Sequence, residues 1–198
     1  MYSISNDKFA QQALLKADGT PNSDTNVKEL SGSTASDGVE FDLTGTIVKG
    51  LNFMAGYSYN FIRYTNTLDK TTIGTTTIGG AVEGQRLVGT TKNTANGTLF
   101  YTFQNGGIKG LKLGASVYYT GKRNGGYNDS KTGAASRLIP LSAFTTFDFS
   151  AGYSWRKLSV LAKVSNLSDE INYYAHENYS INPIAPRQFM TTLSYRFK

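Results

Sequence analysis

The sequence contains no cysteine and only one histidine, His176, among its 198 residues. The absence of cysteine excludes disulfide-stapled folds, zinc ribbons and thiol catalysis. A single imidazole without thiols also leaves no transition-metal cluster of the ordinary type. Proline is rare, with four residues, which is too few for a chain rich in linkers. No apolar run approaches the roughly 18 residues of a membrane-spanning helix, and the mean hydropathy is −0.33.

Aromatic residues and glycine, by contrast, are frequent: the chain has 13 tyrosines, 11 phenylalanines and 21 glycines. This composition favours strands over helices. The length suits one domain with a sizeable core. The first residues do not combine a basic stretch, an apolar core of roughly 7–15 residues and a cleavage site, so no signal peptide is expected.

Apolar and polar residues alternate along seven segments of the chain. The first runs from Val39 to Ile47, and after Lys49-Gly50 the pattern continues from Leu51 to Phe61. A period of two predicts β-strands with one apolar and one polar face. A weaker strand near Tyr2–Ile4 would make eight, and the remaining alternating segments are 99–103, 111–119, 147–155, 158–164 and 189–197.

The connections between these segments alternate in length. Short turns are expected near Lys49-Gly50, at 104–110 and at Arg156-Lys157, whereas long polar connections cover 13–29, 67–85, 122–142 and 173–186. Outer-membrane barrels have this order, because the turns on one side are short and the loops on the other are long. We therefore expect an all-β fold, an antiparallel transmembrane β-barrel with about eight strands in this chain.

The polar face of the predicted strands is compatible with two environments. Asp148 and Lys163 fit a wet lumen and the surface of a soluble sheet equally well. Aromatic placement favours the barrel, because six aromatic residues lie toward strand ends, where an aromatic girdle belongs. These are Tyr57, Tyr59, Tyr118, Tyr119, Tyr153 and Trp155. An extracellular β-sandwich remains the alternative on pattern alone.

A series of segments spread over the chain carries a more specific signal. In order they are Gly38–Gly45, Gly50–Asn52, Ala55–Tyr59, Gly84–Leu87, Lys92–Ala95, Tyr119–Arg123, Phe144–Asp148, Gly152–Trp155, Asn166–Asp169, Tyr173-Tyr174 and Pro186-Arg187. Together they resemble the late barrel of a TonB-dependent outer-membrane receptor, of the ferric-siderophore type. The chain departs from the family pattern at Ser168, where the family has an aromatic residue, and at Lys198, which follows Phe197 where the family usually ends.

The resemblance implies a barrel of 22 strands closed around an amino-terminal plug. Residues 1–198 are expected to be its carboxy-terminal segment, without the plug domain, the TonB box or a signal peptide. The implied function is uptake of a ferric siderophore, or a similar scarce chelate, across the outer membrane of a Gram-negative bacterium. The ferric siderophore would be the transported ligand, and no cofactor is expected.

Basic and aromatic residues at the long-loop ends are the candidate ligand-binding residues. The net charge of +6 would attract anionic chelates, and flat aromatic groups stack on Tyr or Arg. The same residues also fit a rim that meets water, lipid headgroups and lipopolysaccharide. The candidates are Arg63, Tyr64, Lys122, Arg123, Tyr173, Tyr174, His176 and Arg187.

No catalytic residue and no metal site are expected. A hydrolase triad would have to use His176, with Ser180 and Asp169 as candidates, and a loop histidine that only forms hydrogen bonds is the favoured interpretation. The basic residues are scattered among the strands rather than grouped in a stripe, so nucleic-acid binding is not expected either.

The expected partners are outer-membrane lipid and lipopolysaccharide, the plug domain and the remaining barrel strands, with the TonB complex engaged only through the amino-terminal part of the receptor. Two other functions stay open. One is a self-contained eight-stranded outer-membrane barrel with an adhesion or structural role. The other is a secreted, soluble carbohydrate-binding β-domain.

Overall fold

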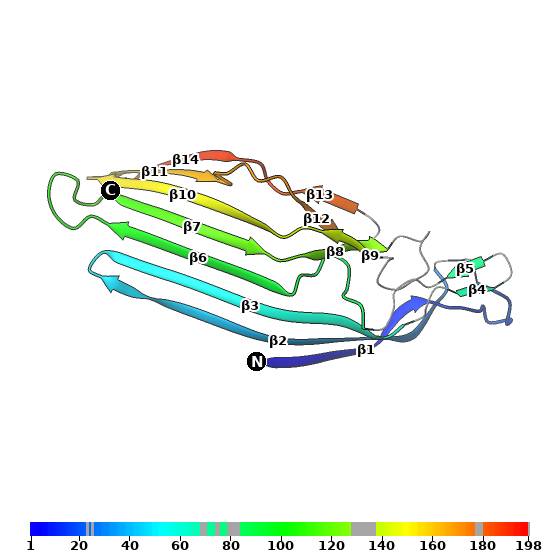
Figure 1. The fold of residues 1–198 in the computed structure, drawn as a ribbon. Coiled ribbons are helices and arrows are strands. Elements are labelled where there is room, and N and C mark those ends of the chain that lie inside the picture. The colour runs from blue at the N-terminus through cyan, green and yellow to red at the C-terminus, as the bar shows by residue number, and fades with distance from the viewer. Residues whose placement is uncertain are drawn as a thin grey trace.

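The body of the molecule is one antiparallel sheet of eight strands (Figure 1). The computed structural model describes residues 1–22, 24, 26–67, 71–73, 76–78, 84–127, 138–176 and 180–197. The strands, in sheet order, are β1 (Tyr2–Gln12), β2 (Lys28–Val48), β3 (Leu51–Asn66), β6 (Asn93–Thr102), β7 (Lys112–Thr120), β10 (Phe144–Trp155), β11 (Leu158–Ser165) and β14 (Gln188–Tyr195). The all-β, antiparallel prediction and the count of eight strands are confirmed. The described residues contain no helix long and apolar enough to cross a membrane.

All long connections lie at one end of the sheet and all short turns at the other (Figure 1). We call these the loop end and the turn end. The loop end holds three short hairpins that the sequence did not predict, because each strand has only three to five residues. They are β4 (Thr71–Ile73) with β5 (Thr76–Ile78), β8 (Arg123–Tyr127) with β9 (Leu138–Leu141), and β12 (Tyr173–His176) with β13 (Ser180–Pro183).

One face of the sheet is apolar and the other is polar, and residues paired across neighbouring strands form rows that point to one face or the other. One cross-strand row consists of Leu43, Ala55, Gly97, Val117 and Phe147. The adjacent row, which points to the opposite face, consists of Asp42, Gly56, Asn96, Tyr118 and Thr146. The alternation predicted from the sequence is therefore carried across the sheet in register.

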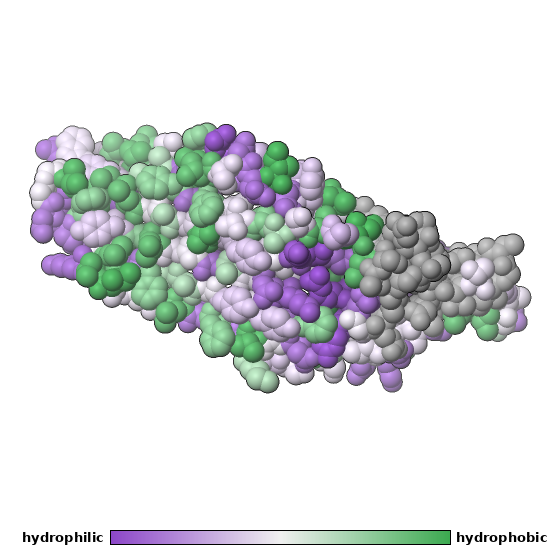
Figure 2. All heavy atoms as spheres, viewed as in Figure 1, coloured by the Kyte–Doolittle hydropathy of each residue, from purple (hydrophilic) through white to green (hydrophobic). Residues whose placement is uncertain are grey.

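The apolar face has no covering layer among the described residues. Leu43 is 64% exposed and Phe147 is 48% exposed, although both lie in mid-strand. Among the described residues, the buried hydrophobic ones are few: Ala13, Phe144, Ala175 and Ile184. In Figure 2, hydrophobic side chains gather over the strands, between hydrophilic side chains at the turn end and a larger hydrophilic area toward the loop end. A sheet of this kind requires an apolar solvent on one face.

Aromatic side chains of the apolar face lie at two levels. Tyr57, Tyr59 and Tyr119 lie toward the loop end, and Tyr153, Trp155 and Tyr195 lie toward the turn end. Tyr118 is a correction to the predicted girdle: its cross-strand neighbours Asn96 and Thr146 place it on the polar face. Consecutive strand residues point to opposite faces, so Tyr118 and Tyr119 cannot share a girdle.

The mid-strand charges lie on the polar face as a pair. Lys163 Nζ is 2.8 Å from Asp148 Oδ2, between neighbouring strands β11 and β10. Asp148 also accepts a hydrogen bond from the backbone N–H of Asn166 at 3.0 Å. Lys198, which follows the predicted final strand, lies outside the described residues.

Candidate ligand-binding site

Arg123, the first residue of β8, is buried at the centre of the loop end and is 2% exposed. Its Nη2 donates hydrogen bonds to Asn172 Oδ1 at 2.7 Å and to the carbonyl oxygen of Tyr173 at 2.9 Å. Its guanidinium carbon lies 4.8 Å from the ring centroid of Phe144. Burial lowers the pKa of Arg123, but a guanidinium remains charged at neutral pH. Arg123 thus connects the β7–β10 loop to the β11–β14 loop.

The connection between β3 and β6 is hydrogen-bonded to the residues on either side of Arg123. The N–H of Gly89 donates to the carbonyl of Asn124 at 2.8 Å, and Arg86 Nη1 donates to the carbonyl of Lys122 at 2.9 Å. Gly89 has a φ of +78°, and a Cβ on it would lie 2.5 Å from the carbonyl oxygen of Ala175. Only glycine fits this approach without displacement. Three of the four long connections therefore meet around Arg123.

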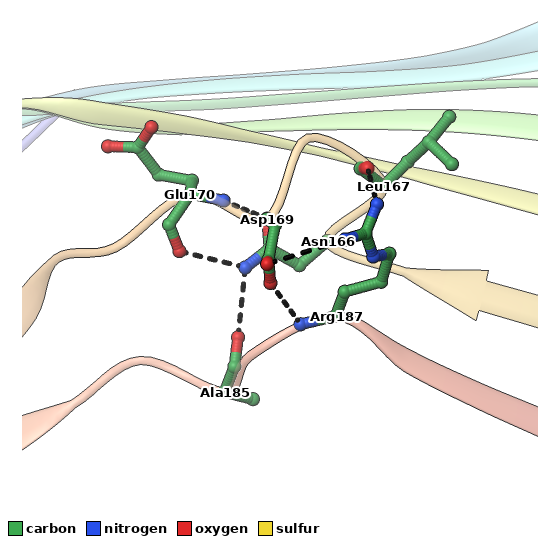
Figure 3. A network of polar contacts seen from close by, with 6 residues as sticks. All are labelled: Asn166, Leu167, Asp169, Glu170, Ala185 and Arg187. Atoms are coloured by element: carbon green, nitrogen blue, oxygen red, sulfur yellow. Dashed lines mark hydrogen bonds and ion pairs between the residues drawn. The ribbon is translucent and has the colours of Figure 1, made fainter.

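Asn166 organises the turn that follows β11 (Figure 3). It is 4% exposed and has a φ of +50°, which Asn tolerates better than most residues. Its Nδ2 donates to the carbonyls of Glu170 at 2.9 Å and Ala185 at 3.0 Å, while its Oδ1 accepts from the N–H of Glu170 at 2.9 Å. One side-chain amide thus holds together the two ends of a long connection.

Arg187, the residue before β14, contacts the turn that follows β11 (Figure 3). Its backbone N–H donates to Asp169 Oδ1 at 3.0 Å, and its Nη2 lies 3.4 Å from Asp169 Oδ2. The side chains of Arg187 and Asp169 are 44% and 48% exposed. Arg187 therefore holds the start of β14 in position, and part of its side chain remains exposed.

Arg63 lies on β3, closer to the loop end than the aromatic residues Tyr57 and Tyr59. Its Nη1 is 2.6 Å from Asp37 Oδ2, and Phe61 lies beneath the guanidinium at 5.1 Å. Asp37, on the loop-end side of Tyr59, also accepts a 2.6 Å hydrogen bond from the Ser3 hydroxyl. The Ser3 hydroxyl and then Arg63 hold the pKa of Asp37 below its usual value. Because Arg63 shares the face of Tyr59, its position favours the rim role over ligand contact.

The other candidates divide between exposed and packed positions. Lys122 and His176 are exposed, and Tyr173 and Tyr174 are 44% and 43% exposed. The ring of Tyr174 packs edge-on against Phe144, with 5.9 Å between centroids. Tyr64 packs against Phe9 at 6.3 Å. The structure thus places Arg123, Tyr173 and Tyr174 in one group, whereas Arg63 and Tyr64 lie on β3.

Sequence reasoning missed the asparagines that hold the loop end together. Asn124, Asn166 and Asn172 are 2%, 4% and 9% exposed. Asn124 donates to the carbonyl of Arg86, Asn166 donates to the carbonyl of Ala185, and the side-chain oxygen of Asn172 accepts from Arg123. An isolated Asn in a polar connection gives no periodic signal, so only the Asn166–Asp169 segment was noted, through the family resemblance. Among the described residues, no three His, Asp or Glu side chains are grouped to hold a metal ion.

A comparison with protein-family models shows the family to which this chain belongs. A model described as TonB dependent receptor-like, beta-barrel, matches residues 4–167. The chain belongs to the TonB-dependent receptor family. Members of this family are outer-membrane proteins of Gram-negative bacteria, so the predicted family, fold and location are confirmed. The family consists of receptors rather than enzymes.

Individual relatives agree with this assignment. The metal-pseudopaline receptor CntO of Pseudomonas aeruginosa is 27% identical over 173 residues, which is 86% of this chain and 22% of CntO. The siderophore receptor PiuA of Acinetobacter baumannii has the same fold, with a TM-score of 0.73 and 18% identity over 98% of this chain and 25% of PiuA. The pyoverdine receptor FpvA of P. aeruginosa, bound to pyoverdine, also has this fold, with a TM-score of 0.70 and 19% identity over 98% of this chain and 26% of FpvA. The chain thus spans about a quarter of the length of these proteins.

Proposed function

We propose that this chain supplies the last strands of a larger outer-membrane receptor that takes up a metal chelate of the siderophore class, with energy from TonB. The match of residues 4–167 to the receptor barrel carries this proposal. The similarity to CntO, a metal-pseudopaline receptor, supports the ligand class. The self-contained barrel and the soluble carbohydrate-binding domain are not favoured, because the relatives are receptors.

The exposed loop-end residues would make the first contact with the chelate. Tyr173, Tyr174 and His176 offer aromatic and imidazole surfaces on one short hairpin, and Lys122 and Arg187 add positive charge. Anionic chelates are attracted by such charges, and flat aromatic groups stack on tyrosine or arginine. Arg123 would act by positioning this hairpin, because its buried side chain bonds to the backbone of Tyr173. Arg63 and Tyr64 would contribute at the rim.

The polar face would line the lumen of the complete barrel. Asp42, Asn96 and the Asp148–Lys163 pair offer hydrogen-bonding groups there, and water or a plug domain could satisfy them. We propose that a plug domain occupies this lumen and that TonB acts on the plug. The mechanism would then be binding at the loop end, followed by rearrangement of the plug.

The test is uptake of radiolabelled iron from a panel of siderophores by cells that carry the complete receptor under iron limitation. Alanine at Tyr173, Tyr174 and His176 together is expected to lower uptake at limiting chelate concentration several-fold, with the amount of receptor in the membrane unchanged. Lys109→Ala, at the turn end, is the matched control and should leave uptake unaltered. Wild-type uptake in the triple variant would contradict the assignment of these residues, and absence of uptake of every chelate by the wild type would contradict the function.

A further inference from the structure

The turn end of the sheet carries charge of one sign. The segments 43–54, 99–116, 152–160 and 190–197 contain none of the chain's 14 acidic residues. They contain six basic residues, all exposed: Lys49, Lys109, Lys112, Arg156, Lys157 and Arg196. The basic residues that look scattered along the sequence are therefore collected by the fold into a positive rim. In outer-membrane barrels the short turns face the periplasm.

A hollow of about 430 Å³ lies within this rim, at the turn between β10 and β11. Its walls are Trp155, Arg156, Lys157, Leu158 and Tyr195. Trp155, Leu158 and Tyr195 form one cross-strand row of the apolar face, so the hollow opens onto the side that meets lipid. Arg156 lies over the Trp155 ring, 5.0 Å from its centroid. One hollow thus combines two cations with an aromatic and aliphatic wall.

The backbone at Arg156 adds a second observation. Arg156 has a φ of +52°, a conformation that glycine and asparagine adopt at lower cost in two-residue hairpin turns. This turn thus has an arginine at a position where its geometry favours another residue. Arg196 is fixed beside this turn, because its backbone N–H donates to the carbonyl of Lys157 at 2.9 Å. Turn geometry alone does not account for this concentration of positive charge.

We propose that this hollow binds the phosphate headgroup of an anionic phospholipid, of the phosphatidylglycerol class, in the periplasmic leaflet of the outer membrane. Arg156 and Lys157 would hold the phosphate, and Trp155, Leu158 and Tyr195 would contact the glycerol and the first acyl methylenes. Aromatic side chains are enriched at this level of membranes, and basic residues near a membrane surface attract anionic lipids. This inference uses the outer-membrane location of the family and is independent of the proposed uptake.

A lipid fits the hollow better than an acidic periplasmic protein does. The apolar wall continues into the exposed lipid-facing row, and Phe197, which packs on Tyr195 at 4.9 Å between centroids, is 83% exposed. A protein partner would be expected to bind the outward tips of the turns, where Lys49 and Lys109 also lie. Binding of an acidic protein is the competing outcome of the experiment.

The experiment measures quenching of Trp155 fluorescence in the complete receptor, reconstituted in phosphatidylcholine bilayers. In one set of bilayers, roughly one lipid in ten is phosphatidylglycerol with brominated acyl chains. In the other set, the same fraction is brominated phosphatidylcholine. Subtracting the signal of the Trp155→Phe receptor isolates Trp155 from other tryptophans. Two basic residues at the surface predict that phosphatidylglycerol is enriched beside Trp155 on the order of 5- to 30-fold.

Arg156→Asn combined with Lys157→Ser removes both charges while placing a turn-favouring residue at the positive φ, so the strands should stay folded. This variant is expected to abolish the preference for phosphatidylglycerol, whereas Lys109→Ser, outside the hollow, should retain it. Equal quenching by the two brominated lipids in the wild type overturns the proposal. So does an equal loss of preference in both variants, because the rim as a whole would then act. A double variant that keeps the lipid preference but loses an acidic protein partner overturns it in favour of protein binding.

Discussion

Replacing Arg123 by methionine is expected to loosen the loop end without unfolding the sheet. Methionine keeps most of the aliphatic stem beside Phe144 but removes the charge and every hydrogen-bond donor of the guanidinium. The bonds to Asn172 Oδ1 at 2.7 Å and to the Tyr173 carbonyl at 2.9 Å are lost. The start of β12, at Tyr173, then loses its hydrogen bond to β8.

The size of the effect follows from these contacts. Hydrogen bonds from a charged donor contribute about 1.5–3 kcal/mol each. Part of this is offset, because the charge is buried and Arg123 Nε has no hydrogen-bond partner among the described residues. A net local loss of about 2–3 kcal/mol corresponds to an opening constant about 30- to 150-fold larger.

Hydrogen exchange followed by mass spectrometry on the complete receptor in detergent measures this opening. Peptides covering 121–127 and 166–176 should exchange faster by that factor, and peptides from β6 and β7 should not change. Lys122→Met is the matched control, since Lys122 is exposed and adjacent. Exchange of both loop peptides within about threefold of wild type would refute the reasoning.

Three further predictions concern other contacts of the loop end. Gly89→Ala should speed exchange in both segments it joins, because its Cβ would meet the Ala175 carbonyl at 2.5 Å; unchanged exchange would contradict the close approach. Asn166→Ala should destabilise the turn after β11 by about 1–3 kcal/mol, measured as earlier cleavage by protease, and Asn166→Asp should restore only part of the protection. The lowered pKa of Asp37 means that its hydrogen bond from the Ser3 hydroxyl stabilises β1–β2 pairing at neutral pH and loses this effect as pH falls through that pKa. Asp37→Asn should remove this pH dependence, and exchange in β1 at acidic pH checks it.

The sequence alone determined the β-architecture of this protein. The alternation from Val39 to Ile47 repeats in later segments, and a period of two is compatible only with strands that have two different faces. The turn residues Lys49-Gly50 and Arg156-Lys157 marked the hairpins, and the alternation of short and long connections marked the two ends. These signals are local, so they can be read without knowledge of which strands pair.

The side-chain contacts and charges gathered at the loop end and at the turn end, by contrast, depended on the tertiary structure. Arg123 was predicted as a ligand contact, but its guanidinium binds Asn172, which is 49 residues away in the sequence, and is buried. The short hairpins, the bonding of Asn166 to Ala185 and the positive rim around Arg156 were equally invisible. Each depends on which distant connections the antiparallel order brings to the same end. A residue in a connection acquires its environment from those neighbours, and pairing over such separations is decided by the register of the whole sheet rather than by any local pattern.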